Sequence, residues 1–81
     1  MEFRKMSLED FNLQCDTTLN SNMSFNEAMN NIESANNNYF YTSMCKNDVI
    51  EAYNNEIEVA RQLDLEFVFI DDLGIYIALQ P

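Results

Sequence analysis

The sequence predicts a single small α+β domain over residues 1–81, with two or three helices packed on a small, largely antiparallel sheet. Three observations predict it. A capping signal opens a helical apolar pattern after residue 23, and a second helical pattern follows residue 46. Two short apolar runs then flank the only glycine, Gly74, as in a C-terminal β-hairpin.

The N-terminal segment fits two patterns. Ser7 is a suitable N-cap for a helix that would place Phe11 and Cys15 on one face. Residues 13–19 instead alternate apolar and polar side chains, which is the spacing of a strand. We expect a short helix over residues 7–12, followed by a strand over residues 13–19.

The segment after residue 23 predicts a helix. Ser24 and Glu27 have the spacing of a capping box, and Met23 with Ala28 have that of a hydrophobic staple. The apolar residues that follow at helical spacing are Phe25, Ala28, Met29, Ile32 and Ala35. The asparagines at 36–38 should end this helix, and the aromatic residues that follow favour a strand over 39–44.

A second helix is predicted to begin at a cap formed by Asn47 or Asp48 and to end near Leu63. Its expected buried stripe is Val49, Ile50, Tyr53, Ile57 and Ala60. Acidic side chains in its first turn suit the positive end of the helix dipole.

The C-terminal hairpin should pair residues 65–70 with residues 75–79 through a turn at 71–74. Both faces of these strands are apolar, so we expect cover on both faces. Its own helices could supply this cover. Alternatively, Tyr76, Val68 and Ile70 form an apolar interface for a homodimer or a partner protein.

Fourteen acidic and four basic residues give a net charge of −10, which excludes several partner classes. Such a field repels nucleic acid and anionic membrane, and it suits a basic protein surface. The apolar runs are too short to cross a membrane, and the first residues lack the apolar core of a signal peptide. We therefore expect a cytoplasmic protein, in the host cytoplasm if a phage encodes it.

The residue types needed for most chemistry are scarce. The chain has no histidine, and its one glycine cannot build a phosphate-binding loop. Cys15 and Cys45 lack the spacing of a zinc site, so we expect free thiols in a reducing cytosol. Asp71 and Asp72 lack the pattern of a calcium-binding loop, so we expect them to form a solvated turn. We expect no enzyme activity, no cofactor and no metal site.

The acids themselves suggest a function. On a rigid frame, carboxylates can imitate a row of phosphates, because a basic groove recognises mainly charge and spacing. Glu51 and Glu58 would lie two turns apart on one helix, about 10.5 Å by the rise of an α-helix. The predicted acidic face consists of Glu27, Glu33, Glu51, Glu58, Asp64, Glu66, Asp71 and Asp72.

In size, charge and lack of catalytic residues the chain is similar in type to small phage or mobile-element proteins that block host defence, including anti-CRISPR and anti-restriction proteins. This resemblance is one of type and involves no specific motif. It implies an inhibitor of a host nucleic-acid-handling protein, acting by nucleic-acid mimicry or through another contact.

Two other hypotheses about function remain open. The chain could be a regulatory, adaptor or antitoxin-like subunit that associates through its apolar C-terminal hairpin, by pairing with itself or with a partner's sheet edge. It could also be a small ligand-binding or enzymatic domain.

Overall fold

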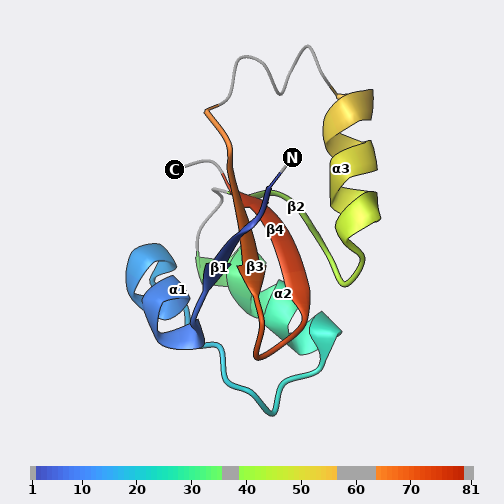
Figure 1. Ribbon diagram of the computed structural model, residues 1–81. Coiled ribbons are helices and arrows are strands. Elements are labelled where there is room, and N and C mark those ends of the chain that lie inside the picture. Colours follow the sequence, from blue (N-terminus) through green and yellow to red (C-terminus); the bar gives the residue numbers. More distant parts are fainter. Residues whose placement is uncertain (1, 36–38, 57–63, 80–81) are drawn as a thin grey trace.

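A computed structural model describes residues 2–35, 39–56 and 64–79 of the chain (Figure 1). The predicted α+β class is confirmed, since three helices within these ranges pack against one four-stranded mixed sheet. Along the chain the elements are β1 (Arg4–Met6), α1 (Leu8–Cys15), α2 (Phe25–Ala35), β2 (Tyr39–Ser43), α3 (Lys46–Asn55), β3 (Glu66–Ile70) and β4 (Ile75–Leu79).

The C-terminal hairpin forms the centre of the sheet, whose strand order is β1-β3-β4-β2. β1 runs parallel to β3, and β2 runs antiparallel to β4. Both hairpin strands therefore have a hydrogen-bonded neighbour on each side. The expectation that the hairpin could pair with a partner's sheet edge is wrong, because β1 and β2 are the edge strands.

One face of the hairpin carries the main core. Val68, Ile70, Ile75 and Ile77 are fully buried there. They pack with buried side chains from α1, α2 and the segment between them, namely Phe11, Leu19, Ala28 and Ile32. α2 crosses behind the sheet in Figure 1.

The opposite face of the hairpin is aromatic and lies on the side of α3. Tyr53 of α3 meets Phe67 of β3 edge to face, with ring centroids 5.3 Å apart. Val49 of α3 and Ala78 of β4 are fully buried. The helices α1 and α2 thus cover one face of the hairpin, whereas α3 covers the other face only in part, since Phe67, Phe69 and Tyr76 are half-buried there.

The N-terminal segment differs from the prediction. Residues 4–6 form a strand that was not expected, and α1 continues to Cys15 before Asp16 ends it with φ 55°. Ser7 does cap α1, because its hydroxyl accepts the Asp10 amide hydrogen at 3.1 Å.

The strand expected over residues 13–19 is absent from the described structure, because Asn12 and Asn31 bind the backbone of residues 18 and 19. The side-chain oxygen of Asn12 accepts the Leu19 amide at 2.9 Å, and that of Asn31 accepts the Thr18 amide at 3.1 Å. These amides are therefore not available to a neighbouring strand.

The capping box of α2 is confirmed. The Glu27 amide donates to the Ser24 hydroxyl at 3.2 Å, and the Ser24 amide donates to the Glu27 carboxylate at 3.3 Å. The next strand is confirmed as β2, Tyr39–Ser43.

α3 begins earlier than predicted, at Lys46 with Cys45 as its N-cap, so neither Asn47 nor Asp48 is the cap. The Asp48 carboxylate accepts the Ser43 hydroxyl instead, at 3.1 Å. α3 ends at Asn55. Ile57, Ala60 and the predicted end at Leu63 lie outside the described residues.

The C-terminal hairpin is confirmed with its turn at residues 71–74. Gly74 has φ 64°, the left-handed conformation that a side chain disfavours. Two turn hydrogen bonds, from the Leu73 amide to the Ile70 carbonyl and from the Gly74 amide to the Asp71 carbonyl, are each 3.2 Å long.

Candidate functional site

Carboxylates dominate the described surface. Every acidic residue within the described ranges is exposed except Glu66. Glu66 forms an ion pair with Arg4 and accepts a hydrogen bond of 3.3 Å from the Gln14 amide group. Its carboxylate therefore connects β3 to β1 and α1, and its main partners belong to the same molecule.

The basic side chains in the described ranges are all engaged within the molecule. Arg4 pairs with Glu66, and Lys5 lies 3.2 Å from the Asp71 carboxylate. Lys46 lies over the ring of Phe3, 5.8 Å from its centroid. A protein that approaches this surface thus meets carboxylates with few competing cations.

The structure divides the predicted acidic face between the two layers. Glu27 and Glu33 belong to α2, behind the sheet, whereas Glu51 belongs to α3 on the aromatic side. Glu58 lies outside the described residues.

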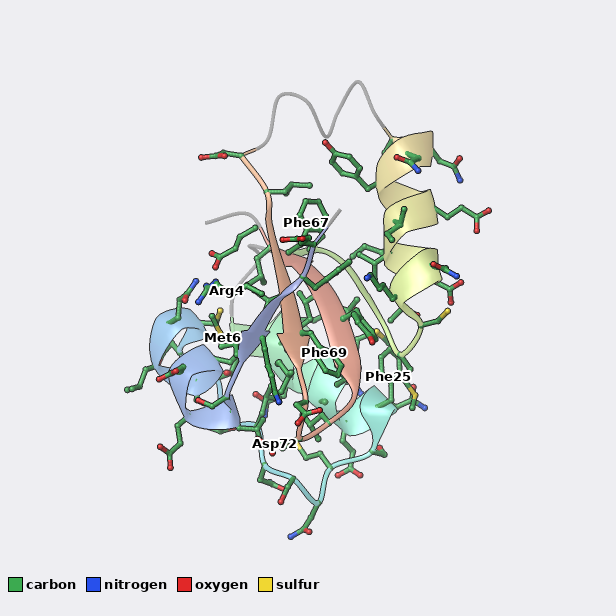
Figure 2. The ribbon with its side chains drawn as sticks, in the orientation of Figure 1. Arg4, Met6, Phe25, Phe67, Phe69 and Asp72 are labelled. Carbon is green, nitrogen blue, oxygen red and sulfur yellow. The ribbon has the colours of Figure 1, made fainter. Side chains whose placement is uncertain are left out.

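The remaining predicted acids lie at the two ends of β3. Asp64 is exposed just before the strand, and Asp71 and Asp72 are exposed in the hairpin turn. Figure 2 shows Asp72 at the turn, with Phe67 toward the other end of the strand. The predicted residues therefore form separate acidic surfaces and not one continuous face.

A small hollow of about 190 Å³ lies between α3 and the edge strand β2, and its chemistry is distinctive. Asp48 and Glu51 are one turn apart on α3, so they project from the same side of the helix. Tyr41 of β2 is 40% exposed, and Asn55 adds a side-chain amide. Of these residues, Glu51 alone was predicted from the sequence as a binding residue, whereas Tyr41 and Asp48 were not.

A larger, open hollow of about 550 Å³ lies along α2. Three of its polar residues, Thr18, Glu27 and Asn31, already form hydrogen bonds within the molecule. Glu27 belongs to the capping box, and the Asn31 side chain donates to the Thr18 hydroxyl at 2.9 Å.

The aromatic face is the main apolar surface near the hairpin. Phe3, Phe67, Phe69 and Tyr76 are half-buried there, and Phe69 lies on this face in Figure 2. The predicted interface residues Val68 and Ile70 are fully buried in the main core, so they cannot line a surface. Of the three predicted residues, only Tyr76 reaches this face.

The described residues include no group of three or more histidine, cysteine, aspartate or glutamate side chains that could hold a metal ion. Within the same ranges Cys15 is half-buried, Cys45 is exposed, and neither belongs to a disulfide. The described helices are too short and too polar to cross a membrane.

The geometry thus offers three surfaces for recognition: exposed carboxylates, the hollow beside α3 and the aromatic face. No family model matches this chain, and neither a curated protein nor a solved structure shows significant similarity to it.

Proposed function

We propose that this protein is a small acidic inhibitor that binds a basic, nucleic-acid-handling protein of a host cell, such as a CRISPR or restriction effector. In this proposal a phage or another mobile element encodes it, and it acts in the host cytoplasm. The observation that supports the proposal is the arrangement of charge. The described carboxylates are exposed almost without exception, whereas the described basic side chains are few, and each of these exposed groups contacts a carboxylate or an aromatic ring of the same chain.

This arrangement matters because nucleic-acid-binding proteins present lysine and arginine side chains to phosphate groups. Carboxylates held on helices and in a tight turn present the same sign of charge to those side chains. Association would be fast and sensitive to salt, because long-range attraction steers the two proteins together. The inhibitor would then occupy the surface that the nucleic acid needs.

Affinity capture tests the proposal. The tagged protein should capture a nucleic-acid-handling protein from a bacterial extract, and excess duplex DNA should release it. With the purified partner, raising NaCl from 0.05 to 0.5 M should weaken binding by about tenfold or more. Glu51→Lys should weaken partner binding at a given salt concentration. The matched control is Glu9→Lys, which makes the same charge change on α1. A partner that neither DNA nor salt displaces would contradict the proposal.

A second function, that of a regulatory, adaptor or antitoxin-like subunit, is supported by the half-buried aromatic face. Association would then occur through Phe69 and Tyr76, because the hairpin backbone is already paired on both sides. Tyr76→Glu should abolish this association, with little effect of salt. A chain that stays monomeric at micromolar concentration in sedimentation velocity, with Tyr76→Glu leaving partner binding unchanged, would contradict this second function.

A further inference from the structure

The hollow beside α3 combines groups from two consecutive elements, the edge strand β2 and the helix that follows it. Asp48 and Glu51 supply carboxylates from one side of the helix, and Tyr41 supplies an exposed aromatic ring from β2. α3 stands beside β2 in Figure 1. The hollow therefore brings two negative charges and an aromatic side chain together in one small volume.

This set of groups matches a cation of particular shape. A guanidinium group is planar, stacks on aromatic rings and has five N–H donors that suit carboxylate oxygens. An ammonium group is a compact, strongly hydrated charge that gains less from a flat ring and from two separate carboxylates. Among protein side chains, arginine fits the hollow best.

The Asp48 carboxylate is held in place before any ligand arrives. Its Oδ2 accepts the Ser43 hydroxyl at 3.1 Å, and the Ser43 oxygen in turn accepts the Cys45 amide at 3.1 Å. A carboxylate has capacity for further hydrogen bonds, so Asp48 can still accept from a guanidinium group. Because the Asp48 side chain is already fixed, less conformational entropy is lost when it binds a ligand.

We infer that the hollow lined by Tyr41, Asp48 and Glu51 receives an arginine side chain of the partner, one that would otherwise contact a phosphate. This inference rests on the proposed function, because it assigns part of the binding energy to a specific contact. The partner's guanidinium would stack on Tyr41 and donate to Asp48 and Glu51.

The hollow can be tested without the partner. N-acetyl-L-argininamide is the probe, N-acetyl-L-citrullinamide is its uncharged analogue of similar shape, and N-acetyl-L-lysinamide carries the other cation. In ¹⁵N–¹H NMR titrations, argininamide should shift the amide signals of Tyr41, Asp48 and Glu51 with a Kd on the order of 1–10 mM. Citrullinamide should cause no saturable shift, and lysinamide should bind several-fold more weakly. Equal shifts with all three probes, or no local shift with argininamide, would overturn the inference.

Variants then separate the hollow from the general charge of the protein. Asp48→Asn with Glu51→Gln should weaken argininamide binding about tenfold, because two charge-assisted hydrogen bonds become neutral. Glu9→Gln with Asp10→Asn removes the same charge from the exposed first turn of α1 and should leave binding unchanged. Tyr41→Leu should weaken binding about threefold, whereas Tyr41→Phe should not. If the α1 pair weakens binding as much as the α3 pair, the hollow is not the site.

The same variants distinguish this inference from the proposed function. One outcome is a captured partner that binds the Glu9→Gln and Asp10→Asn double variant but not the Asp48→Asn and Glu51→Gln double variant. That result supports both the arginine site and the proposed function. A partner that retains both variants equally contradicts the arginine site and leaves the proposed function standing. If no basic partner is captured, the proposed function fails, and the titration with argininamide still decides whether the hollow binds a guanidinium group.

Discussion

Phe69 and Tyr76 stack across the central hairpin, with ring centroids 4.5 Å apart and ring planes inclined by 24°. They are direct partners in the register of β3 and β4, on the face opposite the main core. Phe3 adds an edge contact to Tyr76 at 5.3 Å. The aromatic face is thus held together by contacts between its own rings.

This stack should make a measurable contribution to stability. Phe69→Ala and Tyr76→Ala should each destabilise the fold, and a double-mutant cycle should give a coupling free energy of about 0.5–1.5 kcal/mol. Urea unfolding followed by circular dichroism measures it. Leu13→Ala is the control, because Leu13 is 84% exposed and should change stability by less than about 0.5 kcal/mol. Strictly additive effects of the two aromatic changes would show that the rings do not interact.

Asn12 should be among the most sensitive polar positions. Its side chain accepts from the Thr17 hydroxyl at 2.7 Å and from the Leu19 amide at 2.9 Å, and it donates to the Leu19 carbonyl at 2.9 Å. Asn12→Ala removes all three bonds in a part-buried site, so we expect a loss of about 2–3 kcal/mol in urea unfolding. Asn26→Ala, at an exposed position of α2, should have no destabilising effect. If the two changes have the same effect, Asn12 does not stabilise the loop that follows α1.

These contacts also show which parts of the fold the sequence could predict. α2 and the hairpin have local signals, since the capping box needs only residues three apart and Gly74 marks its own turn. The segment after α1 has no such signal. Thr17 and Leu19 are buried and Thr18 is exposed, so the alternation of a strand is present there. The backbone is nevertheless paired with asparagine side chains from α1 and α2, which no local pattern reveals.

The same reasoning applies to the candidate site. The spacing of Asp48 and Glu51 already places both on one side of a helix. The addition of Tyr41 depends on how α3 packs on β2, which is a tertiary relationship. For β1, the contacts are the parallel pairing with β3, the packing of Met6 in the core and the Arg4–Glu66 ion pair, which involve residues far along the chain, so this short strand could not be recognised from its own three residues.

Substitutions at Gly74 measure the free-energy cost of a left-handed backbone conformation with little contribution from other effects. A Cβ atom at this position would have no neighbour within 4 Å, so a substitution there introduces no collision. Gly74→Ala should destabilise the protein by about 1–2 kcal/mol, because only the backbone conformation is penalised. Gly74→Asn should cost less, since asparagine tolerates this conformation better. An alanine variant as stable as the wild type in thermal and urea unfolding would show that the turn adopts another conformation.

Two buried threonines should respond differently to the same substitution. Thr42 on β2 is 8% exposed, and its hydroxyl is buried without a hydrogen-bond partner in the described structure. Thr17 is 7% exposed, and its hydroxyl donates to Asn12. Valine has nearly the same shape as threonine but lacks the hydroxyl, so the comparison isolates the hydrogen bond.

Thr42→Val should leave stability unchanged or raise it by up to about 1 kcal/mol, because an unsatisfied polar group leaves the interior. Thr17→Val should lower it by about 1–2 kcal/mol, because the Asn12 oxygen loses a donor in a part-buried site. Urea unfolding of both variants at one pH and salt concentration provides the measurement. Equal losses for the two variants would mean that the Thr42 hydroxyl has a partner in solution. A gain at Thr42 alone would identify it as a site where the fold carries a buried polar group at a net cost in stability.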